Sequence, residues 1–332
     1  MFSKTVKRYH LGLLDKVQIS KLILTKTGAL AGKILKYIFL FCMCFVVLYP
    51  LIYMISVSLR TVPDLYDPTV IWVPRHWTLD NYKMVWQAIN YLKTLVQTVF
   101  LTTFSTFLNV STCAIIGYGF ARFRFRFKGL LFGLVIFSII VPSQSIAIPL
   151  FVQYYAFDFF GLGQIGRLFT GEPLTINLLN TPFTLFLPAM FGQGIRSGLF
   201  IYIFRQFFRG MPRELEDAAY IDGCGVFRTF IRIMAVNAIP AFISCILFSF
   251  VWYWNDYYLS NLYFNDARTL STALGSLQDM LRSMGMDFYT DPYLIVAQMQ
   301  AACILTILPL IILFIVLQRQ FTQSIDKTGI VG

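Results

Sequence analysis

Between two long apolar runs of the chain lies the polar stretch PRELEDAAYIDGCG, residues 212–225. Pro212 favours the start of a helix, and the acidic side chains after it suit the positive end of a helix dipole. Ala218 and Ala219 continue the helix with a small face that another surface can approach closely. Gly223 favours the end of the helix and a reversal of the chain. We therefore expect a short helix, a turn and a second helix over about 227–233, suited to a partner's cleft, with an ordinary amphipathic loop as the alternative.

The rest of the chain is strongly apolar. Of its 332 residues, 57% are hydrophobic and 13% are charged, about half the roughly 25% charged residues of a soluble domain. An aromatic content of 17% also excludes intrinsic disorder. Six runs are long enough to cross a bilayer, at about 20 apolar residues per crossing; they cover residues 35–58, 95–120, 130–155, 183–208, 239–262 and 295–317. The fold class we expect is an all-α integral membrane protein with six transmembrane helices.

The distribution of basic residues predicts the orientation of these spans. With both termini in the cytoplasm, 19 of the 27 Lys and Arg residues fall in cytoplasmic segments and 7 in external ones, with Arg196 inside a span. This is the positive-inside pattern, so the net charge of +11 indicates membrane topology and no nucleic-acid partner. We expect a basic amphipathic cytoplasmic tail over 1–34, lying on membrane lipid, a permease domain over 35–318 with the polar loop at about 212–230, and a cytoplasmic tail over 319–332.

The sequence offers little catalytic chemistry. It has two histidines, His10 and His76, far apart and outside the predicted spans. The segment GALAGK, residues 28–33, is too short for a phosphate loop and lacks the following Ser or Thr. The six cysteines lack a zinc spacing and are expected to act mostly as small buried hydrophobic residues. We therefore expect no enzyme activity, no metal site and no cofactor on this chain, and any ATP must be bound by another chain.

Several motifs carry a resemblance to a known family. Registered on Gly223, the segment Asp217-Ala218-Ala219 matches the Glu-Ala-Ala of the "EAA" loop of ABC importer permeases, with Asp in place of Glu, and Ile233 matches the pattern's later Ile. Ala235 and Val236 depart from the Leu-Pro of that pattern. The stretches GYGFAR at 117–122, WVP at 72–74, WTLDNY at 77–82 and WND at 254–256 resemble carbohydrate-importer permeases of the maltose-permease-like, binding-protein-dependent branch.

The resemblance implies a type I ABC importer permease fold in a bacterial plasma membrane. It implies a second related permease subunit, two cytoplasmic ATP-binding subunits that hold ATP and Mg, and an extracytoplasmic solute-binding protein. The polar loop would then be a cytoplasmic coupling helix that contacts the ATPase. Its expected coupling residues are Glu216, Asp217, Ala218, Ala219, Asp222 and Gly223.

Four further residues are candidates for the solute path. Asn255 and Asp256 are costly in a membrane, and Trp254 offers a ring that could stack on a sugar; packing or anchoring of the helix is the alternative for each. Arg196 lies inside the fourth predicted span and needs an acid or carbonyl groups nearby, for which Asp256 is a candidate. The alternatives to a sugar permease are an ABC permease for a non-sugar solute, an ATP-independent secondary transporter, and a membrane-embedded structural or receptor protein.

Overall fold

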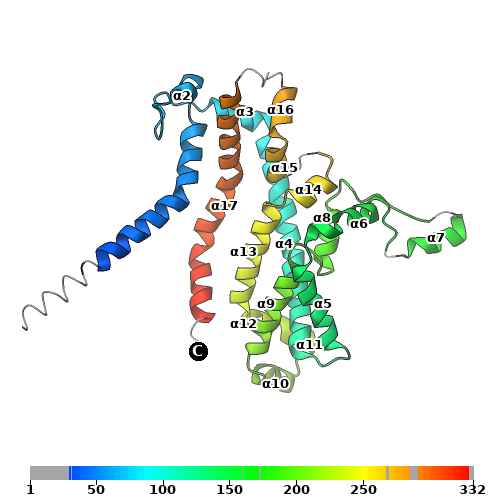
Figure 1. Cartoon of the computed structure of the whole chain (residues 1–332). Helices are drawn as coiled ribbons and strands as arrows, with labels where there is room; N and C mark the ends of the chain where they lie inside the picture. Colours follow the sequence, from blue (N-terminus) through cyan, green and yellow to red (C-terminus); the bar gives the residue numbers. More distant parts are fainter. Residues whose placement is uncertain are drawn as a thin grey trace, which may run out of the picture. The chain divides into compact units, whose positions relative to one another are not determined.

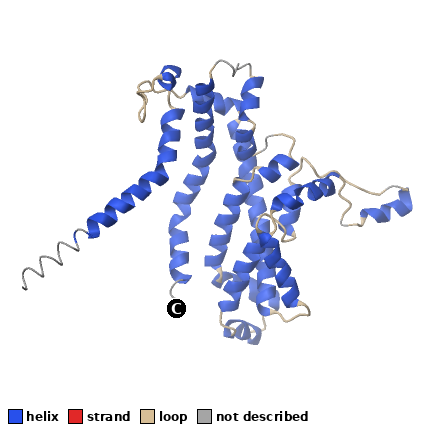
Figure 2. Ribbon diagram, in the orientation of Figure 1, coloured by secondary structure: helices blue, strands red, loops and turns tan. Residues whose placement is uncertain are grey.

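The computed structural model describes residues 30–328, apart from residues 31, 160, 172, 267, 268 and 285–290. The described chain is helical, and its extended pairings are two isolated bridges, Arg60 with Trp77 and Phe157 with Ile176 (Figure 2). It divides into two units, residues 1–77 and 78–332. The predicted N-terminal tail lies almost wholly outside the described residues.

The first unit contains a long apolar helix, Gly32–Ser58, and the short helix α2, Val62–Tyr66. The long helix confirms the first predicted run. The loop after α2 folds back on the end of the long helix, because the Arg60 guanidinium donates to the carbonyl of Ile71 at 2.8 Å. Asp64 of α2 is buried and accepts a hydrogen bond of 2.8 Å from the backbone N–H of His76. This segment is therefore an ordered structure with its own polar contacts.

The second unit is a bundle of helices (Figure 1). In chain order these are α3 Asp80–Ala88, α4 Tyr91–Arg122, α5 Lys128–Ile140, α6 Ser143–Tyr155, α7 Gly163–Thr170, α8 Phe183–Met190, α9 Ser197–Gly210, α10 Glu214–Ile221, α11 Val226–Thr229, the π-helix Phe230–Met234, α12 Ala235–Asn237, α13 Ile239–Trp254, α14 Tyr258–Tyr263, α15 Leu270–Gly275, α16 Leu277–Ser283 and α17 Pro292–Thr328. Helices α10 and α11 lie at one end of the bundle, and α3 and α16 lie at the other.

Three described helices are long and apolar enough to cross a membrane: Gly32–Ser58, α4 and the segment Pro292–Gln318 of α17. They match the first, second and sixth predicted runs. The third run is a bent pair, because α5 and α6 meet at 103° where Pro142 interrupts the helix. The segment Val226–Asn237 meets α13 at 80°, with Pro240 in the first turn of α13. Counting each bent pair as one span gives up to five spans in the described part of the chain.

The fourth predicted run is not one continuous helix. It is divided between α8 and α9 by a break over residues 191–196, in which Gly192 and Arg196 adopt positive φ angles of +72° and +59°. The expectation of an uninterrupted helix over 183–208 is therefore corrected.

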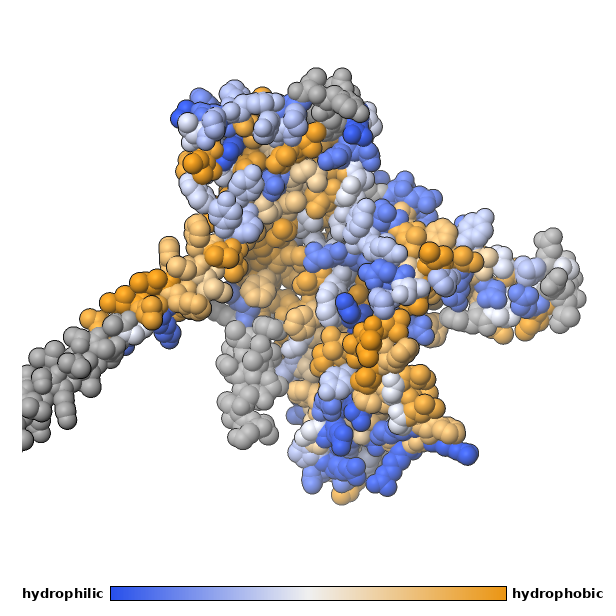
Figure 3. Space-filling model, viewed as in Figure 1, coloured by the Kyte–Doolittle hydropathy of each residue, from blue (hydrophilic) through white to orange (hydrophobic). Residues whose placement is uncertain are grey.

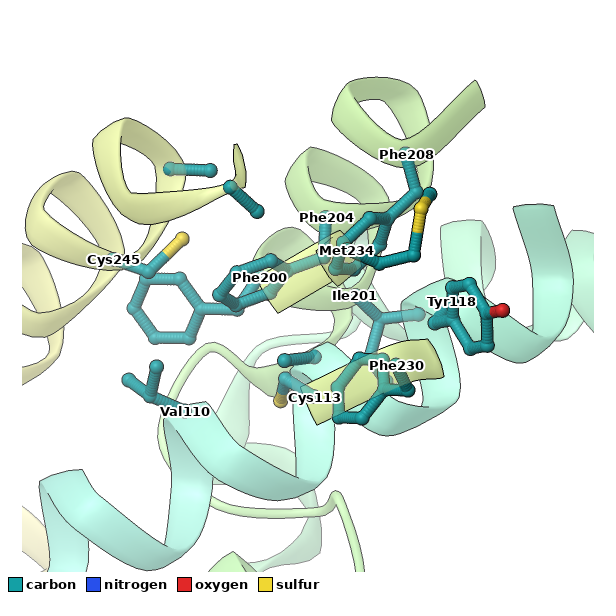
Figure 4. Close-up of a cluster of buried hydrophobic side chains, with 13 residues drawn as sticks. Val110, Cys113, Tyr118, Phe200, Ile201, Phe204, Phe208, Phe230, Met234 and Cys245 are labelled. Carbon is teal, nitrogen blue, oxygen red and sulfur yellow. The ribbon is translucent and has the colours of Figure 1, made fainter. Parts of the chain in front are cut away.

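One of the buried hydrophobic clusters of the second unit lies where α4, α9 and α13 meet (Figure 4). Phe200, Phe204 and Phe208 line one face of α9 and are fully buried. They pack with Tyr118 of α4 and Met234 of the π-helix. The spacing of four residues places the three rings on one side of the helix, which explains why this face is inside.

The backbones of α4 and α9 approach closely at Gly117. A Cβ atom at this position would lie 2.6 Å from Cβ of Phe204 and 3.0 Å from the backbone nitrogen of Arg205. Any side chain here would therefore force the two helices apart. The glycine permits the close packing that buries the phenylalanine row.

Surface polarity is unequal along the second unit. The end that carries α10 and α11 is rich in hydrophilic residues, whereas the middle of the bundle shows broad hydrophobic areas (Figure 3). Large exposed hydrophobic side chains on α4 include Val96, Phe100 and Phe107. Exposed apolar area of this extent is typical of a surface that faces lipid or another apolar chain.

Candidate functional site

The polar stretch quoted above forms the helix α10 and the turn after it. Arg213 is the N-cap, and the first turn carries Glu214, Glu216 and Asp217. Three acidic residues in this position are stabilised by the positive end of the helix dipole. The predicted helix is therefore present, with its start at Glu214.

Gly223 ends this helix as the sequence predicts. Its φ is +78°, a left-handed conformation that a Cβ atom disfavours. Its N–H donates to the carbonyl of Tyr220 at 3.1 Å, and the N–H of Cys224 donates to the carbonyl of Ala219 at 2.9 Å. These two bonds form a Schellman cap, which satisfies carbonyls that would otherwise lack a partner.

Glu216 anchors α10 to the end of α4. Its Oε1 accepts a hydrogen bond of 2.5 Å from the hydroxyl of Tyr118, and its Oε2 lies 3.0 Å from Nε of Arg122. The side chains of Arg122 and Glu216 are 7% and 9% exposed. Arg122 also donates to the carbonyl of Met211 at 2.9 Å, just before α10. We name Tyr118, Arg122 and Glu216 the clamp.

The other predicted residues of α10 divide between two faces. Ala219 is buried at 2% exposure, on the side of the clamp. Asp217, Ala218 and Asp222 are exposed. The small face predicted from Ala218 and Ala219 is therefore split, because Ala219 packs on its own chain and Ala218 faces outward.

Exposed apolar side chains surround this outward face. Ile221 is 87% exposed and Phe227 is 70% exposed, and Val226, Tyr220 and Ile231 are also exposed. Exposed apolar residues grouped at an otherwise hydrophilic end are typical of a surface that contacts another protein or the membrane. The arrangement combines an internal attachment to α4 with an exposed outer face.

A family model described as "Binding-protein-dependent transport system inner membrane component" matches residues 113–327, which include the clamp and α10. The chain belongs to this family. It is therefore an ABC permease, a membrane translocation subunit and not an enzyme.

Curated relatives match along most of the permease. The chain is 25% identical over 305 residues to the "Probable ABC transporter permease protein YurM" of Bacillus subtilis (strain 168), covering 91% of this chain and 89% of the relative. It is 27% identical over 312 residues to the "Arabinooligosaccharides transport system permease protein AraQ" of Halalkalibacterium halodurans, covering 92% and 99%.

A solved structure shares the fold. One chain of the crystal structure of a bacterial ABC transporter involved in the import of the acidic polysaccharide alginate superposes with a TM-score of 0.67 at 19% identity. The match covers 87% of the permease and 95% of that chain. The helical arrangement is therefore that of an ABC importer permease.

Trp254, one of the four residues predicted for the solute path, lies inside the permease core. It is 1% exposed, and its Nε1 donates to the carbonyl of Thr306 at 3.2 Å, which joins α13 to α17. Its ring also stacks on Phe250, with ring centroids 5.7 Å apart. In this conformation Trp254 acts as a packing residue between two helices.

Asn255 and Asp256 have different surroundings. Asn255 is exposed and lines an open cavity of about 580 Å³ between the end of α13 and helices α15, α16 and α17. Ser271, Gln278 and Thr306 also line this cavity. The carboxylate of Asp256 accepts hydrogen bonds of 2.8 Å from both the backbone N–H and the hydroxyl of Ser260. Asp256 therefore orders the start of α14.

Arg196 is not paired with Asp256. Its guanidinium carbon lies 5.6 Å from the ring centroid of Trp252 in α13, and the residue is exposed. The structure therefore does not bring the four predicted path residues together as one cluster.

Three functional side chains were not assigned from the sequence. Tyr118 and Arg122 belong to the GYGFAR motif, but their contact with Glu216 joins positions almost a hundred residues apart. Asn109 donates to the carbonyl of Ile195 at 3.1 Å within the break of the fourth run. A buried Asn in the middle of an apolar run was the available signal, because such a residue needs hydrogen-bonding partners.

Proposed function

We propose that this chain is one membrane-spanning half of an ATP-driven importer for a sugar or oligosaccharide. An extracytoplasmic binding protein delivers the solute. The chain pairs with a second permease subunit, and two cytoplasmic ATP-binding subunits supply the energy. Six spans with both termini in the cytoplasm are part of this proposal, and the charge asymmetry of the sequence supports them.

The observation that carries the proposal is α10, with its clamp on one side and its open face on the other. In the proposed mechanism, the ATP-binding subunits close on ATP and displace α10. The clamp passes this displacement to α4, and the spans open toward the binding protein. Hydrolysis then returns the permease to its inward-facing form. ATP and Mg are held entirely by the ATP-binding subunits, and this chain contributes the contact surface.

The sugar assignment is supported by the names of the relatives. Besides arabino-oligosaccharides, the solutes in these names include diacetylchitobiose, for a Streptomyces coelicolor permease 25% identical over 288 residues. Another is polygalacturonan/rhamnogalacturonan, for a Bacillus subtilis permease 26% identical over 250 residues. The cavity beside Asn255 is mostly apolar, with a few hydroxyl and amide groups among its lining residues that can hydrogen-bond a sugar.

Reconstitution tests the proposal. The permease, its partner permease, the ATP-binding subunits and the binding protein are placed in proteoliposomes, and ATP-dependent uptake of labelled saccharides is measured. We expect uptake that requires both ATP and the binding protein. Uptake that needs no ATP would indicate a secondary transporter. Tight binding of only peptides or amino acids by the binding protein would overturn the sugar assignment.

Orientation is tested separately. Reporter fusions after Val85, after Cys224 and at the C-terminus should report external, cytoplasmic and cytoplasmic positions. An external position for the Cys224 fusion would overturn both the topology and the role of α10.

A further inference from the structure

Side chains of the neighbouring helices α4 and α13 form hydrogen bonds with the backbone at the break between α8 and α9. The hydroxyl of Thr112 in α4 donates a hydrogen bond of 3.1 Å to the backbone carbonyl of Met190. The side-chain amide of Asn109, also in α4, donates to the backbone carbonyl of Ile195. From α13, the hydroxyl of Tyr253 accepts a hydrogen bond of 3.2 Å from the N–H of Ile195. Irregular backbone at membrane depth persists only where such partners satisfy it or where it lines a cavity. The break is thus a stable feature of the bundle.

This construction fixes Arg196 in an uncommon conformation. A φ of +59° is rare for a residue with a long side chain. A Cβ atom at Gly194, two residues earlier, would collide with the hydroxyl of Tyr253 and lie 3.0 Å from Oδ1 of Asn109. The chain is thus pressed against α4 and α13 before Arg196, and the arginine itself is exposed, with its guanidinium over the ring of Trp252 of α13.

Arg196 lies deep in the bilayer under the proposed topology. The 14 residues of α9 separate it from the α10 end, which corresponds to about 21 Å at roughly 1.5 Å per residue. The hydrocarbon core is about 30 Å thick. A guanidinium at this depth requires a counter-charge or a water-filled path.

The described part of the second unit supplies no counter-charge. Arg196 makes no ion pair with any described residue, and Asp256 is engaged by Ser260. The contact with Trp252 is a cation–π contact, which orients the guanidinium without neutralising it. No described residue therefore neutralises the positive charge of Arg196, which leaves it available to a ligand outside this chain.

We propose that Arg196 binds a carboxylate of an acidic saccharide, so that the imported solute is a uronate-containing oligosaccharide. The planar fork of a guanidinium matches a carboxylate with two parallel hydrogen bonds, which a neutral sugar cannot reproduce. Gln193, exposed in the same break, offers amide groups that suit the neighbouring hydroxyls. This inference rests on the proposed import function and names the solute class for it.

The test compares acidic and neutral saccharides of equal length in the reconstituted complex. The probes are trigalacturonate and a neutral galactotriose, each presented by the binding protein, with uptake and stimulated ATP hydrolysis as readouts. The variants are Arg196→Gln, which removes the charge, and Arg196→Lys, which keeps it. Arg209→Gln is the matched control, because it removes one charge from the exposed far end of the same helix.

We expect Arg196→Gln to lower trigalacturonate uptake by about tenfold or more, the loss of a charge-assisted contact, with Arg196→Lys intermediate and Arg209→Gln unchanged. An equal loss for both saccharides, or no loss, would overturn the inference. Loss of the partner permease from Arg196→Gln complexes, restored by Arg196→Lys, would show instead that the arginine pairs with that subunit. Delivery of neutral saccharides alone would overturn this inference but leave the import function standing, whereas delivery of no saccharide would remove both.

Discussion

Arg122 and Glu216 form a buried ion pair between the end of α4 and the first turn of α10, with Nε and Oε2 3.0 Å apart. The pair has a third member, because the hydroxyl of Tyr118 donates to the other carboxylate oxygen. Both charges are thus removed from water and compensated by each other. Such pairs give modest net stability but are strongly destabilising when one partner is removed.

The first prediction removes the carboxylate charge of the clamp. Glu216→Gln leaves the Arg122 guanidinium buried without its counter-charge, so we expect a loss of about 3–5 kcal/mol in the stability of this contact. The measurement is thermal unfolding in detergent together with co-purification of the ATP-binding subunits. Glu214→Gln, on the exposed side of the same helix, should behave as wild type. Equal behaviour of the two variants would refute the role of the clamp.

The second prediction separates docking from internal packing on α10. Ala219→Trp must overfill a buried site, which costs about 1–3 kcal/mol or more, so it should lower the amount of folded permease. Ala218→Trp changes only the exposed face and should leave the permease folded. It should nevertheless weaken binding of the ATP-binding subunits, measured by pull-down from detergent. Normal ATPase binding by the Ala218 variant would show that this face is not the docking surface.

The third prediction uses two nearby glycines with different backbones. Gly223 has a φ of +78°, whereas Gly225 has a φ of −75°. A Cβ atom at either position would have no neighbour within 4 Å, so the difference is purely conformational. Gly223→Ala should reduce stability by about 1–2 kcal/mol and lower coupled ATP hydrolysis, while Gly225→Ala should be nearly neutral. Similar effects at both positions would contradict the capping role of Gly223.

The fourth prediction concerns Trp254. Because its ring is buried and its Nε1 bonds to α17, Trp254→Ala should cost about 3–5 kcal/mol and reduce the yield of assembled complex. Asn255→Ala changes an exposed cavity residue and should alter solute uptake with yield unchanged. The comparison needs uptake normalised to the amount of purified complex. Full yield and reduced uptake for the Trp254 variant would place its ring in the solute path after all.

The fifth prediction is a pH dependence in the first unit. The backbone and side-chain hydrogen bonds from His76 lower the pKa of Asp64 below its ordinary value of 3.8. The ionised carboxylate is therefore favoured by folding, and its contribution to stability is complete above that value and lost as the pH falls through the lower folded pKa. Limited proteolysis of the loop after α2 should increase below about pH 4 in the wild type.

The control for the pH prediction is Asp64→Asn. This variant lacks the titrating group, so its loop should be protease-sensitive already at neutral pH and should change less on acidification. An identical acid response in both proteins would assign the effect to another group.

Several parts of the fold were predictable because their signals are local. The long apolar runs that became Gly32–Ser58, α4 and the apolar part of α17 have no proline before their ends except Pro50 and Pro309, which they tolerate. The start and end of α10 follow from its acidic first turn and Gly223. These features depend on residues within one or two turns of each other.

The remainder depends on contacts between distant segments. The alignment with the EAA motif places Asp217 at the position of the Glu in that motif. In the structure the acidic residue that faces inward is Glu216, because it bonds to Tyr118 and Arg122 of α4. The break at 191–196 escaped prediction because its flanks are apolar and its glycines are equally typical of close helix packing. The break becomes visible in the positive φ angles of Gly192 and Arg196 and in the hydrogen bonds of Ile195, which accepts from Asn109 and donates to Tyr253.

The close approach of α4 and α9 at Gly117 has a consequence for how motion spreads through the bundle. With no room for a Cβ atom between them at Gly117, the two helices are in close backbone contact there, which favours their moving together. The clamp lies near one end of this helix pair, and Arg196 precedes α9 at its other end, about four helical turns away. In the proposed mechanism, a displacement of α10 is therefore expected to move the Arg196 end of α9 as well.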